Sequence, residues 1–127
     1  MAIRPELNIR LPNSPGALLD VCRALANERV NILAMDLDNP GLLRLVVDNH
    51  VHAAGVLTSL HYSVSARDVI VVAVTNGPGA IVPVLGLLAD AGFNIDYAYG
   101  TGADSAGAAA IVLGVGDPMR AAAAAGI

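Results

Sequence analysis

The chain has 127 residues, of which 55% are hydrophobic and 14% charged, and a formal net charge of −4 at pH 7. An acidic chain with only 3% aromatic residues argues against nucleic acid or an anionic membrane as a partner. The single cysteine, Cys22, excludes an intrachain disulfide. Since we find neither a signal peptide nor a run of about 18 apolar residues, we expect a soluble cytoplasmic protein without a membrane partner.

The first half of the chain has the pattern of a small α+β unit. Residues 7–11 alternate apolar and polar side chains, as expected of a half-buried strand. Ser14 then has the side chain of a helix N-cap, and Pro15 suits the first helical position. The apolar stripe predicted for this helix is Leu18, Val21, Cys22 and Leu25. The elements predicted after this helix are a strand over 31–38, a tight turn at 39–41, a strand over 42–47, a helix over 52–60 and a strand over 62–65. This order predicts a ferredoxin-like βαββαβ unit with both helices on one face of its sheet.

The second half repeats the first. Residues 13–18 (Asn-Ser-Pro-Gly-Ala-Leu) recur as residues 76–81 (Asn-Gly-Pro-Gly-Ala-Ile), an offset of 63 (76 − 13). Halves of about 60 residues are marginal alone, so we expect them to share an interface. The offset grows to 69 between Asp48 and Asp117 (117 − 48), which predicts an inserted, mobile loop at 100–107. The second half has no counterpart of the strand over 62–65, so we predict a second unit truncated at its last strand.

Pro83 interrupts the repeat. It falls inside the helix that the offset predicts, where proline costs about 3 kcal/mol or more. Either the second helix begins later than the first, or its first turn is distorted. We therefore expect two related but non-equivalent loops, with the better-formed loop at residues 13–18.

Apolar side chains on both faces of the predicted strands indicate an oligomer. Leu33, Met35 and Leu37 are predicted to lie on the strand face opposite to Ile32 and Ala34. In the second half, Ile70, Val72 and Val74 alternate in the same way with Val69, Val71 and Ala73. Because the helices cover one face of a sheet, we predict that a homodimer or higher homo-oligomer covers the other.

The repeated turn carries no acid, base or nucleophile that both copies share. Gly16 and Gly79 are predicted in a first helical turn, where glycine costs about 1 kcal/mol relative to alanine, and close approach of a ligand would explain them. The unpaired N–H groups of a helix start bind small carboxylates, and Asn13 and Asn76 would add side-chain amides. The alternative is a purely structural strand-to-helix turn, which common descent would also copy.

With these motifs the chain resembles the tandem ACT-domain proteins, a family of stand-alone regulatory proteins of bacteria. The resemblance rests on Asn-x-Pro-Gly-Ala-(Leu/Ile), Leu-Ala and Asn-Ile in both halves, with residues 41–48 and 93–99 in support, and covers nearly the whole chain. It implies an α+β fold of two tandem ferredoxin-like βαββαβ units, residues 1–67 and 68–127, with their sheets side by side.

The resemblance also implies a binding site for an amino acid between ACT units. In the family, the ligand meets the strand-to-helix loop of one unit and the second strand of its neighbour. The loop residues implied here are Asn13, Ser14, Pro15, Gly16, Ala17, Leu18, Asn76, Gly77, Pro78, Gly79, Ala80 and Ile81. The second-strand residues implied here are Asn31, Ile32, Leu33, Asn94, Ile95, Asp96 and Tyr97. No cofactor is implied.

Other polar side chains have two interpretations. The potential metal ligands are Asp48, His50, His52 and His61. They cross a predicted strand-to-helix junction and have no counterpart in the second half, so we predict no metal site. Tyr97 and Tyr99 share a strand face with Ile95, which predicts packing, although Tyr97 could still shape a pocket. Asp96 either pairs with a ligand ammonium group or is a solvated strand residue.

The sequence thus predicts a non-enzymatic regulatory protein that binds a free amino acid between ACT-like units. Binding would stabilise one arrangement of the halves, which a regulated enzyme could read as its partner. Aliphatic side chains with a few tyrosines favour an apolar, aromatic or histidine ligand. The alternative is a ligand-free oligomerisation or structural module of ferredoxin-like fold. An enzyme of this fold would need a catalytic group that the duplicated residues do not supply.

Overall fold

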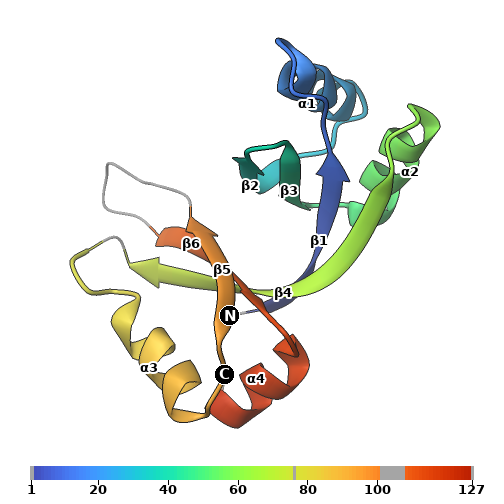
Figure 1. The fold of residues 1–127 in the computed structure, drawn as a ribbon. Coiled ribbons are helices and arrows are strands. Elements are labelled where there is room, and N and C mark those ends of the chain that lie inside the picture. Colours follow the sequence, from blue (N-terminus) through green and yellow to red (C-terminus); the bar gives the residue numbers. More distant parts are fainter. Residues whose placement is uncertain (1, 76, 101–107, 127) are drawn as a thin grey trace. The chain divides into compact units, whose positions relative to one another are not determined.

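A computed structural model describes residues 2–75, 77–100 and 108–126. The chain forms two compact units: a first unit, Pro5–Arg67, and a second unit that combines Met1–Arg4 with Asp68–Ile127. The α+β class and the twice-repeated ferredoxin-like order of elements are confirmed (Figure 1). The predicted loop at 100–107 lies outside the described residues, apart from Gly100.

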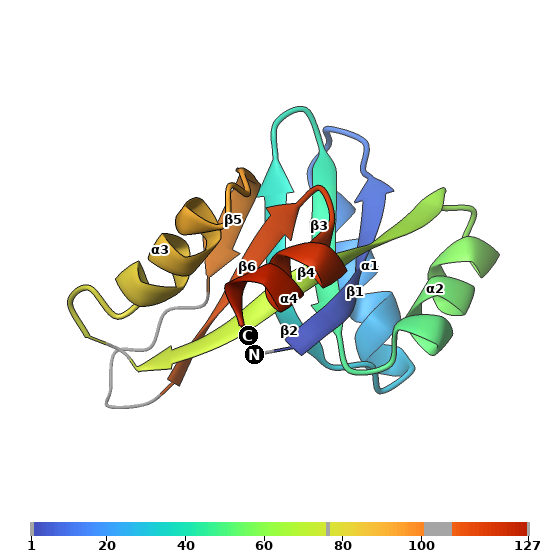
Figure 2. The ribbon, with the colours of Figure 1, turned by 90° about the horizontal axis from the view of Figure 1, so that it is seen from below.

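The first unit packs two helices against four strands. Its elements are β1 (Ala2–Arg10), α1 (Ala17–Asn27), β2 (Ile32–Asp38), β3 (Leu42–Val47), α2 (His50–Ser59) and the start of β4 (Val64–Thr75). The strands follow the order β2-β3-β1-β4, and β3 pairs antiparallel with both β1 and β2. The two helices lie side by side (Figure 2) and bury Val21 and Leu25 of α1 with Leu57 of α2. This apolar stripe at helical spacing is the one that the sequence predicted.

A β-bulge in β2 changes which side chains share the helix-covered face. Directly opposed residues of an antiparallel pair lie on the same face. Ile32 opposes Val47 and Met35 opposes Leu45, and both partners belong to the core, but the register shifts just after Ile32. The prediction that Met35 and Leu37 lie on the opposite face from Ile32 is therefore wrong, because the bulge breaks the alternation. At the edge strand these two side chains remain 42% and 45% exposed.

The second unit has the same order of elements. Its strands and helices are the rest of β4, α3 (Val82–Asp90), β5 (Ile95–Gly100), β6 (Ala108–Val115) and α4 (Pro118–Ala125). β6 pairs antiparallel with β4 and with β5. The helices α3 and α4 lie side by side (Figure 1), and the core contains Ile70, Leu88, Leu113 and Ala121.

Residues near the start of the chain contribute a strand to the second unit. Within the described residues, α4 is the last element of the second unit. In the first unit, the last strand β4 stands beside the first strand β1. In the second unit β4 is itself the first strand, and the strand beside it is β1, whose residues 2–4 belong to this unit. The start of β1 thus stands beside the first strand of the second unit, which is the place that the last strand takes in the first unit, and β4 runs through both units as one 12-residue strand.

The helices of the described ranges are short. The longest, α1, has 11 residues, and none is long and apolar enough to cross a membrane.

Candidate functional site

The loop between β1 and α1 contains the first group of predicted site residues, and its backbone differs from the prediction. α1 begins at Ala17, and Gly16 is its N-cap residue, with a left-handed backbone at φ 86°. The backbone carbonyl of Ser14 accepts a hydrogen bond from the Ala17 N–H at 3.3 Å. The predictions that Ser14 caps the helix and that Pro15 is its first residue are wrong, because the chain enters the helix through a left-handed turn that glycine adopts readily.

This geometry changes the explanation of the repeated glycine. Gly16 and Gly79 have φ values of 86° and 71°, and both precede the helical turns. No atom lies within 4 Å of a Cβ placed on Gly16, so lack of space does not require glycine there. The left-handed backbone accounts for both glycines, and the structural alternative is therefore sufficient for this feature of the repeat.

The turn between β2 and β3 is fixed against the end of β1. The Leu11 N–H donates to the Gly41 carbonyl oxygen at 2.7 Å, and the Gly41 N–H donates to the Asp38 carbonyl oxygen at 2.6 Å. Gly41 has a φ of 129°, and a Cβ there would collide with the Leu11 carbonyl oxygen. The predicted tight turn at 39–41 is confirmed, and its tip lies beside the loop between β1 and α1.

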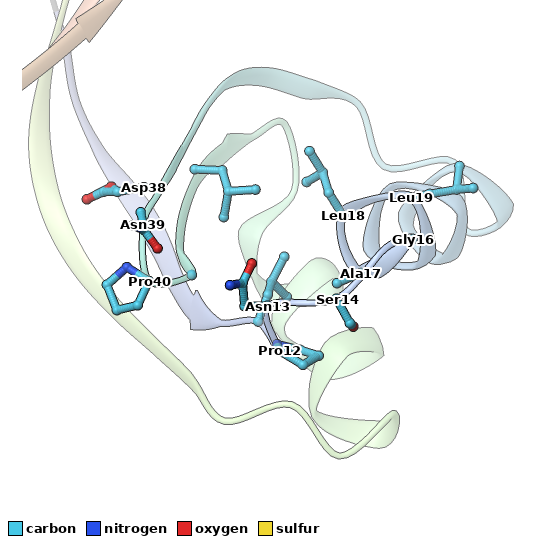
Figure 3. A pocket seen from close by; sticks show the side chains of 13 residues that line it. Pro12, Asn13, Ser14, Gly16, Ala17, Leu18, Leu19, Asp38, Asn39 and Pro40 are labelled. Atoms are coloured by element: carbon cyan, nitrogen blue, oxygen red, sulfur yellow. The ribbon is translucent and has the colours of Figure 1, made fainter.

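Loop and turn line an open cavity of about 470 Å³ (Figure 3). Five of the six predicted residues of the first loop line it, namely Asn13, Ser14, Gly16, Ala17 and Leu18, whereas Pro15 does not. The other lining residues are Leu11, Pro12, Leu19, Leu37, Asp38, Asn39, Pro40 and Gly41. The sequence marked Asn-Pro-Gly as a turn, but no local signal indicated that this turn meets the helix start.

The cavity combines amide groups with apolar walls. Figure 3 shows Asn13 and Asn39 on its two sides, with their side chains in the space between, and Leu18 on the side of α1. The Asp38 carboxylate lies on the far side of the turn from α1 (Figure 3), where its Oδ2 accepts a hydrogen bond from Arg44 at 2.8 Å. Arg44 also pairs with Asp36 at 3.0 Å. Asp38 is the charged residue of the lining, and its ion pair holds that charge outside the cavity.

The predicted second-strand residues of the first half do not line this cavity. The Asn31 N–H donates to Asp48 Oδ1 at 3.0 Å, and the Asn31 carbonyl oxygen accepts from the Asp48 N–H at 3.1 Å. Ile32 packs against the core, and Leu33 is 39% exposed. Within the first unit, it is the other end of β2, at Leu37, that meets the loop.

The second loop starts its helix later than the repeat predicts. Asn76 lies outside the described residues; Gly77, Pro78 and Gly79 are exposed, and Ala80 and Ile81 are half-buried. α3 begins at Val82, so Pro83 lies in its first turn, where the missing N–H breaks no helical hydrogen bond. Of the two alternatives, the later helix start is the one observed.

The predicted residues around β5 are mainly structural in their contacts. Asn94 and Asp96 are exposed, and Ile95 packs against the second core. The Tyr97 ring lies against Gly114, where it would overlap a Cβ, and it stacks on Tyr99 with centroids 6.3 Å apart. This agrees with the packing role predicted for the two tyrosines.

The potential metal ligands of the sequence analysis do not form a metal site among the described residues, and two of them have other partners. Within residues 2–75, 77–100 and 108–126, no group of three or more histidine, cysteine or acidic side chains could hold a metal ion. His52 Nε2 lies 3.6 Å from Glu28 Oε1, and Asp48 bonds to Asn31. Burial raises the pKa of the half-buried Cys22 thiol above its ordinary value.

The chain matches a known family over nearly its whole length. The family described as ACT domain pair matches residues 1–122. A protein from Bacteroides thetaiotaomicron has a similar structure, with 29% identity, a TM-score of 0.86, and coverage of 96% of this chain and 85% of that chain. The regulatory subunit of aspartate kinase from Thermus flavus is similar with 18% identity and a TM-score of 0.68, over 98% of this chain and 90% of that one.

Aspartokinase III of E. coli, solved in complex with lysine and aspartate, is similar with 20% identity and a TM-score of 0.63. The match covers 98% of this chain and 30% of the aspartokinase. At such identities, the two kinase comparisons show a shared fold. No curated protein matches the sequence.

Proposed function

From the premise that the chain belongs to the family of ACT domain pairs, we propose that it is a non-enzymatic regulatory protein that binds a free amino acid. The observation that carries this proposal is the cavity beside α1. Five of its lining residues belong to the Asn-x-Pro-Gly-Ala-Leu motif, which is the segment that the two halves of the sequence share most clearly.

The start of α1 supplies the chemistry for a carboxylate. The N–H groups of a first helical turn lack acceptors within the helix, and the helix dipole is positive at this end. α1 has 11 residues, and Ala17 and Leu18 of its first turn line the cavity. The Ala17 N–H already donates to the Ser14 carbonyl oxygen at 3.3 Å, so a ligand carboxylate would bind at the Leu18 N–H. The amide of Asn13 would bind the carboxylate or ammonium group of the ligand.

Further parts of the proposal concern neighbours of the cavity. We propose that a second copy of the chain supplies Asn31, Ile32 and Leu33 to complete the site, as the family pattern implies. A second, non-equivalent site would use Asn76, Gly77, Pro78, Gly79, Ala80 and Ile81 with Asn94, Ile95, Asp96 and Tyr97. The names of the similar Thermus flavus and E. coli proteins support an enzyme as the regulated partner.

A thermal-shift screen of the full chain against the twenty amino acids tests the proposal. A ligand that binds only the folded state raises stability by RT ln(1 + [L]/Kd), so a selective ligand gives a concentration-dependent rise in Tm. Asn13→Ala should remove this rise, whereas Asn27→Ala, at the exposed end of α1, should preserve it. A folded sample with no shift at millimolar concentration of any amino acid would contradict the proposal.

The alternative function is a ligand-free assembly module. It is favoured by the exposed apolar side chains of the edge strand β2, where Leu33 and Met35 are 39% and 42% exposed. This alternative predicts a flat amino-acid screen together with a molar mass above that of the monomer in light scattering. If Met35→Lys remains folded but has the molar mass of a monomer, the assembly module is favoured.

A further inference from the structure

The cavity beside α1 points to the class of its ligand. We propose that it selects an α-amino acid with an uncharged, aliphatic side chain, and that Asn39, in the turn between β2 and β3, is a specificity-determining residue. This inference rests on the proposed function and deepens it by naming the ligand class and a residue outside the repeated motif.

The first argument for an uncharged ligand side chain is the charge of the cavity lining. Among its lining residues, Asp38 is the one with an ionisable side chain, and its carboxylate lies on the far side of the turn from α1 (Figure 3). That carboxylate is bonded to Arg44 at 2.8 Å. A charged ligand side chain would lose water inside the cavity without gaining a counter-charge, which is unfavourable. The main-chain carboxylate of the ligand does not have this cost, because the positive end of the α1 dipole compensates its negative charge.

The second argument, for an aliphatic ligand side chain, is the apolar surface of the cavity walls. Leu18 and Leu19 of α1 are among the residues that line the cavity, and Leu37 lines it from the end of β2. Leu19 and Leu37 are 54% and 45% exposed. An aliphatic ligand side chain would cover this surface, and apolar burial is a favourable term that a polar side chain would not supply.

The third argument concerns Asn39 in the turn between β2 and β3. Asn39 stands across the cavity from Asn13 (Figure 3), so one amide belongs to the repeated loop and the other to the hairpin tip. An amide both donates and accepts hydrogen bonds, so Asn39 can bind the ammonium group of a ligand whose carboxylate lies at α1. The backbone bond from Leu11 to Gly41 fixes the tip that presents Asn39.

Calorimetric titration of the full chain tests this inference with leucine, isoleucine, valine and methionine against lysine and aspartate. We expect at least one aliphatic amino acid to bind about tenfold or more tightly than either charged one. Asn39→Ala should weaken that binding about tenfold, the loss expected for a hydrogen bond to a charged group. The competing outcome is lysine bound at Asp38, whose Oδ1 is buried without a hydrogen-bond partner among the described residues.

A designed charge provides the converse test. Leu37→Asp places a carboxylate in the wall and should raise the affinity for lysine relative to leucine by about fivefold, the size of an exposed ion pair. Leu60→Asp is the matched control, because Leu60 is similarly exposed at 50% and does not line the cavity. Binding of lysine or aspartate as tight as that of the aliphatic amino acids overturns the inference but not the proposed function. Failure of all twenty amino acids to bind overturns both.

Discussion

The backbones of Leu11 and Gly41 meet in a contact that joins the two walls of the cavity. The Leu11 N–H donates to the Gly41 carbonyl oxygen at 2.7 Å, while the Leu11 carbonyl oxygen occupies the space that a Cβ on Gly41 would need. Leu11 precedes the repeated loop, and Gly41 ends the turn that carries Asn39. The width of the cavity therefore depends on a close approach that only a residue without a side chain permits.

Gly41→Ala should destabilise the first unit and impair ligand binding. The substitution combines a backbone at φ 129° with a clash against Leu11, and strain of this kind costs about 1–3 kcal/mol. Urea denaturation measures the loss. Gly55→Ala is the control, because no atom lies within 4 Å of a Cβ at this position of α2, and alanine should stabilise the helix by up to about 1 kcal/mol. Equal stability of the two variants would contradict the assigned close approach.

Arg44→Leu should destabilise the end of β2 that carries the turn. Arg44 opposes Asp36 across the strands and also pairs with Asp38, so its removal leaves two neighbouring carboxylates without this cation. Because the Arg44 side chain is only 14% exposed but its partners are 38% and 41% exposed, we expect a loss of about 1–3 kcal/mol. Arg23→Leu, on the exposed face of α1, should change the free energy of unfolding much less.

In the same comparison, added salt should reduce the repulsion between the two carboxylates and narrow the difference between Arg44→Leu and the parent chain. A difference that is independent of salt would indicate that lost packing of the arginine stem, rather than charge, is responsible.

The N-caps of α2 and α4 provide a test of where capping matters. Asn49 Oδ1 accepts the His52 N–H, and Asp117 Oδ1 accepts the Arg120 N–H, each at 3.1 Å. Asn49→Ala should cost about 1 kcal/mol. Ser14→Ala, at the position that the sequence marked as a cap, should cost a few tenths of that value, since Gly16 is the N-cap of α1. A larger loss of stability in Ser14→Ala than in Asn49→Ala would instead indicate that the Ser14 side chain caps the helix.

The helices and turns of the first unit show where local sequence signals are sufficient. The helix stripe of Val21 and Leu25 and the turn at Asn39-Pro40-Gly41 depend on neighbours in sequence, and both were predicted correctly. The ACT resemblance also predicted the loop that lines the cavity. The helix stripe and the turn each have a short-range cause, which is hydrophobic periodicity for the stripe and turn chemistry for Asn39-Pro40-Gly41.

The features that the sequence missed depend on contacts between distant segments. The bulge after Ile32 has no glycine or proline to signal it, and the bond from Leu11 to Gly41 joins two separate turns. The predicted strand over 62–65 does not end before the predicted boundary between residues 67 and 68, because Val64–Thr75 form the single strand β4. The role of residues 2–4 in the second unit is likewise non-local, because it follows from which strand stands beside β4.

Cys22 should react slowly with thiol reagents in the folded chain. Burial raises the pKa of its thiol, and the thiolate is the reactive form, so the folded chain should react more slowly than the unfolded chain near pH 8. The difference between the reaction rates of the folded and unfolded chains should decrease as the pH rises past the raised pKa. By linkage, this thiol stabilises the fold below its unfolded pKa, and the contribution is lost as the pH rises through the folded pKa. Equal rates for folded and unfolded chains near pH 8 would contradict the assignment.

Substitutions of Tyr97 test whether this residue only packs in the second unit or also binds a ligand. Its ring covers Gly114 and stacks on Tyr99, so Tyr97→Ala should cost about 3 kcal/mol through lost burial, and Tyr97→Phe should retain most of the stability. Gly114→Ala should destabilise because its Cβ would overlap the ring, whereas Gly116→Ala, with no atom within 4 Å, should not. If Tyr97→Phe keeps the Tm of the parent chain but loses an amino-acid-induced rise in Tm, the hydroxyl group binds the ligand, and Tyr97 belongs to a second site as well as to the packing of β5 on β6.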